Sequence, residues 1–557
     1  MKRKFFKFLL SFLLIVVAIG IWFSQNWYKM PKYISNFTNS TYENVAIEWE
    51  NGPISRTNSK PNIIVVLIDD LGFNQISSYG GGMANGKFKT PNIDKLASDG
   101  VLCTNGYSSS PVCSPSRASL LTGRFATRFG YEFTPTTSSM MKAVNIFSKK
   151  NEVVDGIYHN DRSENIIDID QMGIPQSERT IAEMLKPEGY HNIHIGKWHL
   201  GHAKDFLPRR HGFDESLRMD QGSLFLPKDD DNVVNAKIDF DPIDKLLWGN
   251  LPYAVNFNEG PRIKPDGHLT DYLTDEAVKV IEKNKNRPFF LYLAYWAVHS
   301  PLQAKKEDYG KLSFIENHEE RVLASMVMTV DRGVGKIRDV LKKNKIDDNT
   351  IIIFTSDNGA PGYIGLPDLN KPYRGWKLTH FEGGVHVPFI VSYPNKISKG
   401  RTYKGRVSNL DIFSTVASVA GVDMTRNDLK DIAFDGANLI PYLSGENEGE
   451  PERILFNKSG DYSFLIKEGW KLQVDLVQNK KWLYNLNEDP TEQLNLSESN
   501  FTKLNELEEI LNNKLSEQVK PIWPSLLDWP IFIDKTLDDK VNKNDEYIFW
   551  ANQKKIT

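Results

Sequence analysis

Cysteine and excess charge are both scarce in this chain of 557 residues, and each shortage excludes a class of protein. Cys103 and Cys113 are its two cysteines, too few for a scaffold of several disulfides or for a cysteine-ligated zinc cluster. The 68 basic and 71 acidic residues nearly cancel, so the chain lacks the basic excess typical of nucleic-acid binding. We therefore predict a protein without a nucleic-acid partner. With 40% hydrophobic residues, the chain can form a large packed core.

The start of the chain is basic and then apolar. Four basic residues stand among the first seven: Lys2, Arg3, Lys4 and Lys7. The almost wholly apolar run Phe8 to Phe23 follows, which is the pattern of an export signal. Left uncleaved, this run would be an N-terminal membrane anchor, although it is slightly short for a full span. We expect residues 1–23 to be a signal peptide or membrane anchor, the protein to be periplasmic, secreted or membrane-anchored, and residues 24–60 to be a linker.

From residue 61 onward, short apolar runs alternate with helix-like stretches. Four of these runs are typical of strands buried on both faces: Ile63–Ile68, Ile193–Ile195, Phe289–Ala294 and Ile351–Phe354. Helical stretches lie between and beside them, for example Leu269–Lys285 and Glu319–Lys343. This alternation predicts an α/β fold with a large mixed, mainly parallel sheet sandwiched by helices. We place this domain at residues 61–449.

The pattern of strand and helix candidates changes near Glu450. Three short strand candidates follow, Ser463–Ile466, Trp470–Asp475 and Lys481–Leu486, and an amphipathic helix is expected over Leu504–Gln518. An aromatic, proline-rich tail ends the chain. Residues 450–557 are therefore predicted to form a small α+β subdomain built on an antiparallel sheet.

Chemically reactive side chains follow each of the four apolar runs of the first domain. They are Asp69 and Asp70, Lys197 and His199, His299, and Asp357 and Asn358. Ligands of open parallel sheets bind outside the carboxyl ends of the strands, so these groups are expected to converge in one crevice. A single strand-end aspartate is usually a helix cap or turn residue, and a single histidine is usually hydrogen-bonded in the core. Four such strand ends together favour a functional site.

The donor types at these strand ends indicate a metal and a class of substrate. Asp69, Asp70, Asp357 and Asn358 offer oxygen ligands, which calcium and magnesium prefer, whereas zinc favours nitrogen and sulfur. The neighbouring lysine and histidines add cationic and proton-transferring groups. Such a site suits an anionic tetrahedral ester, either a sulfate or a phosphate.

Cys113 stands in a Ser/Pro-rich loop before a helical stretch. One interpretation is a disulfide with Cys103, which an exported chain permits. The other is a reactive thiol activated by the helix N-terminus and Arg117. The residues by themselves favour neither.

Six groups of residues occur in the order found in one known family. They are Asp69-Asp70; Cys113-Ser114-Pro115-Ser116-Arg117 followed by Leu121-Thr122-Gly123-Arg124; Gly196-Lys197-Trp198-His199-Leu200-Gly201; His299-Ser300-Pro301; Ser356-Asp357-Asn358-Gly359; and Arg374-Gly375-Trp376-Lys377 with Glu382-Gly383-Gly384. This set resembles the type I, formylglycine-dependent sulfatases of the alkaline-phosphatase superfamily. The resemblance covers roughly Pro61 to Ser444, and it makes residues 61–449 a sulfatase catalytic domain with an alkaline-phosphatase-like fold.

The resemblance implies a role for each motif residue. Cys113 would be converted to Cα-formylglycine and act as the nucleophile, which removes the disulfide interpretation. One calcium ion would be held by Asp69, Asp70, Asp357, Asn358 and the residue at Cys113. Arg117 would orient the formylglycine, and Lys197 and Lys377 would bind sulfate oxygens. Asp357 would be the base, and His299 with Lys377 would be the general acid. His199 would accept the proton of the second hydroxyl. Arg374 matches a motif position without an assigned role.

The resemblance also implies partners. The expected substrate is a sulfated carbohydrate or polysaccharide fragment, and a formylglycine-generating or anaerobic sulfatase-maturating enzyme would modify Cys113. Three segments could border the substrate or be ordinary surface: residues 218–267, residues 209–211 and the C-terminal tail. The alternatives are a phosphonate monoester or phosphodiester hydrolase of the same superfamily, and a catalytically inactive carbohydrate-binding protein.

Overall fold

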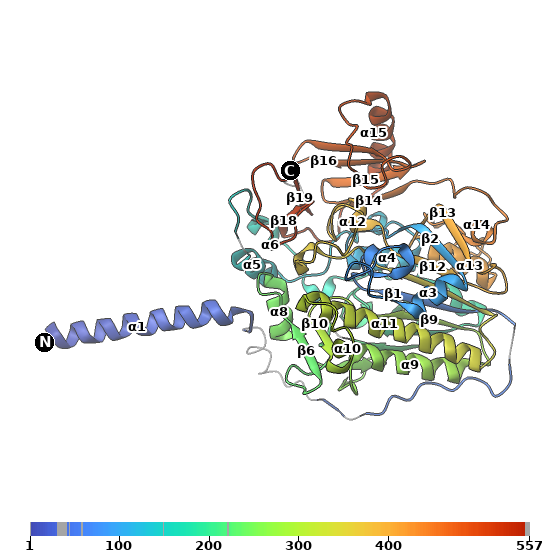
Figure 1. Ribbon diagram of the computed structural model, residues 1–557, viewed down its shortest axis with the longest axis horizontal. Coiled ribbons are helices and arrows are strands. Elements are labelled where there is room, and N and C mark those ends of the chain that lie inside the picture. The colour runs from blue at the N-terminus through green and yellow to red at the C-terminus, as the bar shows by residue number, and fades with distance from the viewer. Residues whose placement is uncertain are drawn as a thin grey trace.

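A sheet of ten strands forms the centre of the molecule (Figure 1). The structure is a computed structural model that describes residues 2–29, 42–43, 45–56, 59–148, 150–219 and 222–551. In spatial order the strands are β13 (Arg401–Ser408), β2 (Val101–Tyr107), β12 (Phe389–Ser392), β11 (Thr350–Ser356), β1 (Asn62–Ile68), β9 (Phe289–Ala294), β4 (His191–Gly196), β5 (Glu215–Arg218), β7 (Val255–Phe257) and β8 (Arg262–Ile263).

The central strands β11, β1, β9, β4 and β5 are all parallel neighbours. Among the ten strands, β12 and β7 run against this direction, because each pairs antiparallel with both of its neighbours. Parallel pairing brings the carboxyl ends of the central strands to the same edge of the sheet, which we call the carboxyl edge. The sequence-predicted strands correspond to β1, β4, β9 and β11.

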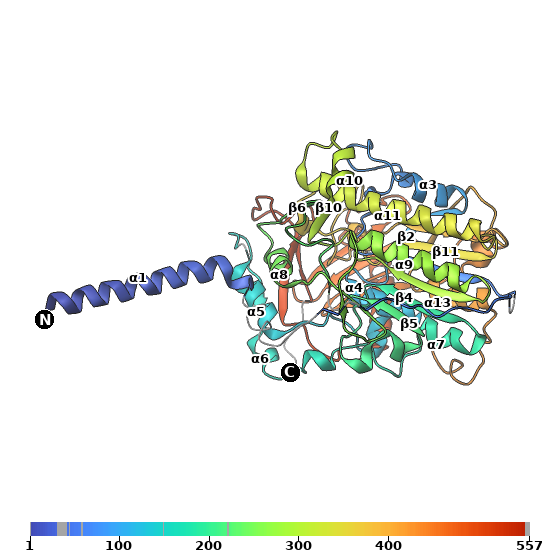
Figure 2. The same ribbon diagram turned by 90° about the horizontal axis from the view of Figure 1, so that it is seen from below.

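Helices cover both faces of this sheet, as Figure 2 shows. On one face α3 (Pro91–Ser98), α9 (Leu269–Asn284) and α11 (His318–Lys343) pack with Ile64, Val66 and Ile68 of β1. On the other face α4 (Cys113–Thr122), α7 (Ile181–Leu185) and α13 (Asp411–Ala420) pack with Ile63, Val65 and Leu67. Successive side chains of a strand point to opposite faces, so a continuous apolar run supplies both cores. The predicted α/β sandwich is confirmed.

The C-terminal region contains a four-stranded antiparallel sheet. Its strands are β14 (Leu455–Ser459), β15 (Tyr462–Lys467), β16 (Trp470–Asp475) and β17 (Lys480–Asn485), followed by α15 (Phe501–Ser516). One face packs on Leu504, Leu507 and Leu511, which share a stripe of α15. The other face packs against the first domain through Phe381 and Val385. In the tail, β18 (Leu527–Phe532) pairs with β19 (Tyr547–Trp550) and with β3 (Ile157–Tyr158).

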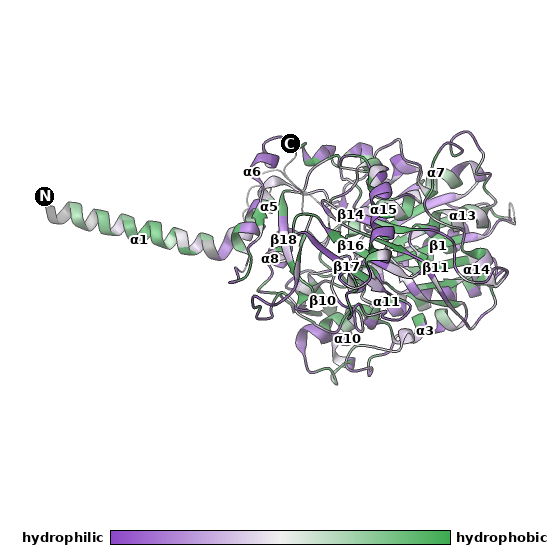
Figure 3. Ribbon diagram, turned by 90° about the horizontal axis from the view of Figure 1, so that it is seen from above, coloured by the Kyte–Doolittle hydropathy of each residue, from purple (hydrophilic) through white to green (hydrophobic). Residues whose placement is uncertain are grey.

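The N-terminal helix α1 (Lys2–Asn26) projects from the body of the molecule, and Figure 3 shows apolar residues along much of it. Within the described residues, no helix combines the length and apolar character needed to cross a lipid bilayer. In the predicted linker 24–60, residues 30–41, 44, 57 and 58 lie outside the described residues. Two tryptophans of its described part are buried: Trp27 stacks on Phe147 at 4.0 Å between ring centroids, and Trp49 donates to Glu276.

Candidate active site

The carboxyl edge brings the four predicted strand ends together. Ile68 of β1 pairs with Ser356 of β11, so the Asp69-Asp70 and Asp357-Asn358 pairs leave adjacent strands at the same level. The backbone N–H of Asp69 donates to Ala297 at 3.1 Å, and that of Val298 donates to Asp69 at 2.9 Å, which ties the end of β1 to the segment that carries His299. These contacts join three of the four strand ends, and Lys197 after β4 joins the fourth, because its Nζ donates to Asp69 Oδ2 at 2.6 Å.

Cys113 enters this cluster from α4. It is the first residue of a wholly buried helix, and its Sγ donates to Asp69 Oδ1 at 3.3 Å and to Asp70 Oδ1 at 3.6 Å. Both cysteines are free, and Cys103 is buried in β2, so the disulfide interpretation is wrong. Burial, followed by Asp357 and Asp69, raises the pKa of the Cys113 thiol well above its ordinary value. The unmodified residue is therefore a poor thiolate nucleophile despite its position at a helix N-terminus.

Arg117 is paired with the carboxylates of the cluster. One turn after Cys113, its Nε and Nη2 contact Asp357 Oδ2 at 2.9 and 2.7 Å, and its Nη1 donates to the Lys197 carbonyl at 3.0 Å. The side chain is completely buried. Burial and Asp69 raise the pKa of Asp357 to about 6, while Arg117 opposes this rise. Arg117 thus compensates the carboxylates and fixes Asp357 rather than stabilising a thiolate.

Two lysines neutralise the other carboxylates. Lys197 Nζ donates to Asp69 Oδ2 at 2.6 Å, and Lys377 Nζ donates to the two oxygens of Asp70 at 2.7 and 2.8 Å. Burial penalises the Lys377 ammonium, but Asp70 and its neighbours raise the pKa of Lys377 well above its ordinary value. Lys377 is therefore a cation at neutral pH, and both lysines lie against the clustered aspartates.

The two predicted histidines are neutral. Burial, with Lys197 and Arg117, lowers the pKa of His199 well below its ordinary value, and its buried Nδ1 has no hydrogen-bond partner among the described residues. His299 donates from Nδ1 to the Ser300 carbonyl at 2.6 Å, and its Nε2 lies 3.6 Å from Asp70 Oδ2. Burial lowers the pKa of His299 to about 3, which Asp70 opposes and Lys377 reinforces. Both imidazoles are therefore unprotonated at neutral pH.

The donor set fits a calcium ion. One ligand atom from each of Asp69, Asp70, Cys113 and Asp357 lies within 4.8 Å of all the others. Calcium–oxygen bonds of about 2.4 Å place any two ligand atoms at most about 4.8 Å apart. Asn358 donates from Nδ2 to Asp70 Oδ1 at 2.7 Å, and its Oδ1 is buried without a hydrogen-bond partner within the described part of the chain. An unpaired carbonyl beside clustered carboxylates is the environment that a hard cation satisfies.

Two aromatic residues of the site were not predicted from the sequence. Lys197 Nζ lies 4.7 Å from the ring centroid of Trp296, which also stacks on His299. Tyr363 contacts Asp70 and Lys377 through its hydroxyl. Neither residue belongs to a motif or carries a charge, so nothing in the sequence distinguishes them from core aromatics.

The segments suggested as substrate borders lie in different environments. Asp241, within 218–267, caps α8 (Pro242–Asn250); burial raises its pKa to about 7, and Lys377 is near enough to oppose this rise. Residues 220 and 221 of that segment lie outside the described residues. His211 is completely buried. The tail binds Arg374, which forms a bidentate ion pair with Asp534 at 2.8 and 2.6 Å.

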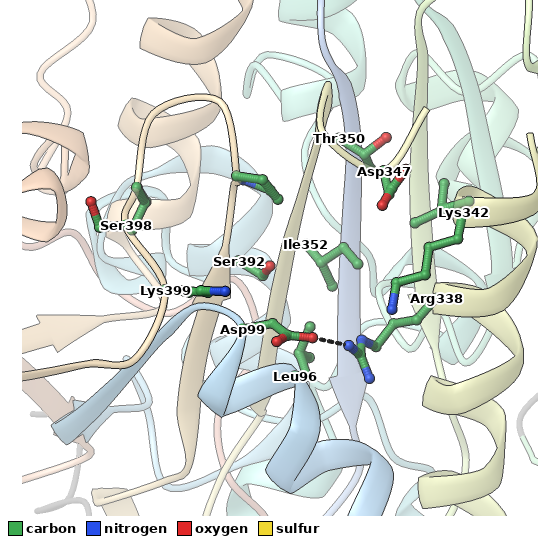
Figure 4. A pocket seen from close by; sticks show the side chains of 13 residues that line it. Leu96, Asp99, Arg338, Lys342, Asp347, Thr350, Ile352, Ser392, Ser398 and Lys399 are labelled. Atoms are coloured by element: carbon green, nitrogen blue, oxygen red, sulfur yellow. Dashed lines mark hydrogen bonds and ion pairs between the residues drawn. The ribbon is translucent and has the colours of Figure 1, made fainter. Parts of the chain in front are cut away.

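A separate cavity of about 270 Å³ lies away from these groups (Figure 4). It is lined by residues of α3 and α11 and by the amino end of β11, with an Arg338–Asp99 ion pair at its wall. None of the predicted site residues lines it. The parallel strands begin near this cavity and end at the carboxyl edge. The cavity therefore lies at the opposite edge of the sheet from the clustered aspartates.

Comparisons with known proteins agree with this geometry. Residues 61–422, more than half of the chain, match the Sulfatase family. Human N-acetylgalactosamine-6-sulfatase is 33% identical over 389 residues, which cover 69% of this chain and 66% of that relative, slightly less than two thirds of its length. Human steryl-sulfatase is 31% identical over 469 residues, covering 73% of this chain and 74% of the relative.

A solved structure is similar over an even larger share of the chain. The crystal structure of Ps i-CgsB in complex with k-i-k-neocarrahexaose has a TM-score of 0.67 and 29% identity, covering 83% of this chain and 94% of that chain. The family match includes all strand-end groups from Asp69 to Lys377. By this match and the arrangement of its carboxyl edge, the chain belongs to the sulfatase family, in the alkaline-phosphatase-like superfamily.

Proposed function

We propose that the chain is an exported sulfatase that hydrolyses sulfate esters of a sulfated carbohydrate or polysaccharide fragment. The observation that carries this proposal is the convergence of Cys113, three aspartates, Arg117 and two lysines at one buried edge of the sheet. The carbohydrate substrate is supported by two similar proteins, an N-acetylgalactosamine-6-sulfatase and a protein bound to k-i-k-neocarrahexaose. The basic and apolar start of the sequence supports export.

Charge balance supports an anionic substrate. Three carboxylates, Asp69, Asp70 and Asp357, face three cationic side chains, Arg117, Lys197 and Lys377. One bound calcium ion would leave this cluster with an excess of positive charge, which favours an anionic ester. We propose that Asp69, Asp70, Asp357, Asn358 and the residue at position 113 hold this ion, which would supply positive charge for the developing oxyanion.

The chemistry requires more than the thiol of Cys113, whose pKa is raised. We propose that Cys113 is converted to formylglycine, whose hydrate offers two hydroxyls: one to attack sulfur and one to expel sulfate afterwards. Because Cys113 is 2% exposed in the folded chain, a formylglycine-generating or anaerobic sulfatase-maturating enzyme would have to reach it before α4 is packed. Arg117 would orient this residue through Asp357 and α4.

Proton transfers are assigned by protonation state and position. Asp357 would take a proton from the attacking hydroxyl, and neutral His199, with its unpaired Nδ1, would take the proton of the second hydroxyl. Lys377 and Lys197 would bind sulfate oxygens. Lys377 carries a proton at neutral pH, so it would donate a proton to the leaving alcohol. His299 would share this role, because a bound anionic ester would raise its pKa.

The reaction is tested with formylglycine-bearing protein and a panel of defined sulfated oligosaccharides, scored for free sulfate. We expect release of sulfate that depends on Cys113 and calcium. The same protein is assayed on phosphonate monoesters and phosphodiesters, because the donor set accepts any tetrahedral anionic ester. A higher kcat/KM for those esters would replace the sulfatase proposal by the phosphohydrolase alternative. Unmodified Cys113 in the native host, with carbohydrate binding but no hydrolysis, would favour the inactive binding protein.

A further inference from the structure

Tyr363 contacts both Asp70, a proposed calcium ligand, and Lys377, a proposed sulfate ligand. It lies in the short 3₁₀ helix Gly362–Ile364, between the Asn358 and Lys377 motifs. Its hydroxyl donates to Asp70 Oδ2 at 3.2 Å and accepts from Lys377 Nζ at 3.2 Å. Lys377 also donates to both oxygens of Asp70. Three groups thus form a closed triangle of hydrogen bonds in which each contacts the other two.

The hydroxyl is both a donor and an acceptor in this position. A neutral phenol can donate one hydrogen bond and accept others, and both uses are filled here by groups of opposite charge. Hydrogen bonds to charged partners are roughly twice as strong as those between neutral groups.

The backbone that carries Tyr363 is fixed from two sides. The Gly362 carbonyl accepts from the Leu537 N–H of the C-terminal tail at 3.1 Å. On its other side Gly362 lies so close to Trp376 that an added Cβ would come within 2.9 Å of the indole Cγ. The Arg374–Asp534 ion pair joins the same tail to the segment before Lys377. The tail and Trp376 therefore place the phenol before any ligand binds.

We propose that Tyr363 is a positioning residue, whose hydroxyl sets the orientation of the Asp70 carboxylate toward calcium and of the Lys377 ammonium toward the sulfate group. The proposal rests on the proposed function for the role of Lys377. Its effect on Asp70 is independent of catalysis and is measured by calcium binding. Outer partners of metal ligands typically contribute about 10- to 100-fold to metal affinity or activity, and we expect an effect in this range.

The test compares Tyr363→Phe with Tyr373→Phe. The first removes one hydroxyl and keeps the ring near Lys377, whose Nζ lies 5.7 Å from the ring centroid. The second removes a hydroxyl from the same segment, where its nearest partner is His386 at 3.5 Å. Calcium affinity of each purified, formylglycine-bearing protein is measured by titration calorimetry with Ca²⁺ alone. Thermal melting confirms that each variant is folded.

We expect the Kd for calcium to rise about 10-fold or more in Tyr363→Phe and to stay unchanged in Tyr373→Phe. At saturating calcium, kcat on a sulfated sugar is expected to fall at least several-fold in Tyr363→Phe, and less on an aryl sulfate, whose leaving group needs little help from a proton donor. An equal calcium Kd and equal kinetic constants in the two variants would overturn the proposal. Absence of sulfate release by the unmutated protein would instead overturn the proposed function, while the calcium titration would still decide the effect on Asp70.

Discussion

Two clusters of buried charge in the described part of the chain differ in how completely their polar atoms are paired. One is the carboxyl edge with its aspartates and lysines. The other, which we call the joint cluster, lies where the antiparallel sheet meets the first domain and contains Glu382, His386, Lys471, Gln473 and Glu492. Each cluster has a buried lysine held by carboxylates. Burial of charge is therefore not what distinguishes a candidate active site.

In the joint cluster the pairing is complete. Lys471 Nζ lies 2.7 Å from Glu382 Oε1 and 2.9 Å from Glu492 Oε1. Glu382 Oε2 also accepts from Tyr107 and His386, and Glu492 Oε2 accepts from the Glu382 backbone N–H at 2.6 Å. None of these side chains, all within the described residues, has a buried polar atom without a hydrogen-bond partner. Such a network specifies how the two sheets pack.

At the carboxyl edge the pairing is incomplete. Among the described residues there, Asn358 Oδ1 and His199 Nδ1 are buried and unpaired. Unpaired buried polar atoms cost folding free energy, and a bound ligand or ion can complete them. Other buried atoms of the described chain are also unpaired, such as both ring nitrogens of His211. What separates the carboxyl edge from the joint cluster is therefore the combination of unpaired atoms with clustered carboxylates and lysines.

The largest expected effect separates the two cysteines. Cys113→Ala should lower kcat/KM for sulfate release by at least about 1,000-fold with little change in folding, because it removes the proposed nucleophile. Cys103→Ala, in β2, should leave kcat/KM nearly unchanged and cost roughly 1 kcal/mol of unfolding free energy. Steady-state kinetics and thermal melting of the two variants measure both effects. Retention of full activity by Cys113→Ala would contradict the assignment.

Breaking the joint cluster should affect stability instead of chemistry. Lys471→Ala leaves Glu382 and Glu492 buried without their cation, and it should lower the free energy of unfolding by about 3–5 kcal/mol. Denaturant melts measure this loss. The calcium Kd of the folded fraction should equal that of the unmutated protein, since the joint cluster does not contact the aspartates of the carboxyl edge. A changed calcium Kd would show that the two clusters are coupled.

Calcium removal should act on the carboxyl edge alone. Chelation should abolish sulfate release, and restoring calcium to about 100 times its Kd should raise the free energy of unfolding by about 2.7 kcal/mol. Melting curves with and without calcium test this expectation, and magnesium is the control ion. Lys471→Ala should gain as much from calcium as the unmutated protein does. Full activity after exhaustive chelation would exclude the proposed ion.

The smallest effect is expected at the Arg374–Asp534 ion pair, which joins the tail to the segment before Lys377. Asp534 is 55% exposed at its side chain, so water screens the pair, and Asp534→Asn should cost less than about 1 kcal/mol. If Asp534→Asn raises KM while the variant is still fully folded at the assay temperature, the loss of stability does not account for the rise. The tail then positions Tyr363 and Lys377. Kinetics at a temperature well below the melting transition distinguish the two causes.

Several elements of the fold followed directly from local pattern. The runs that became β1, β9 and β11 are mainly apolar because both faces of a central strand are buried, whereas β4 also carries His191, Asn192 and His194. The residues after all four strands lie at one edge because parallel strands end together. In the C-terminal region β15, β16, β17 and α15 were also predicted from local pattern, whereas the fourth strand of that sheet, β14, was not. The edge strand β13, with the polar sequence Arg401–Ser408, has no such pattern.

The sequence by itself determined which strands end in chemically reactive residues and which motifs stand together, because these are properties of neighbours along the chain. Only the tertiary structure decided which side chains contact residues that are distant in the sequence. Lys471 and Gln473 alternate with Leu472 and Val474 in β16, a pattern that predicts a solvent-facing polar row, yet the first domain covers that row and buries both. Tyr363 reaches Asp70 across 293 positions of sequence. Local periodicity records which side of an element is apolar, whereas only packing determines what the polar side meets.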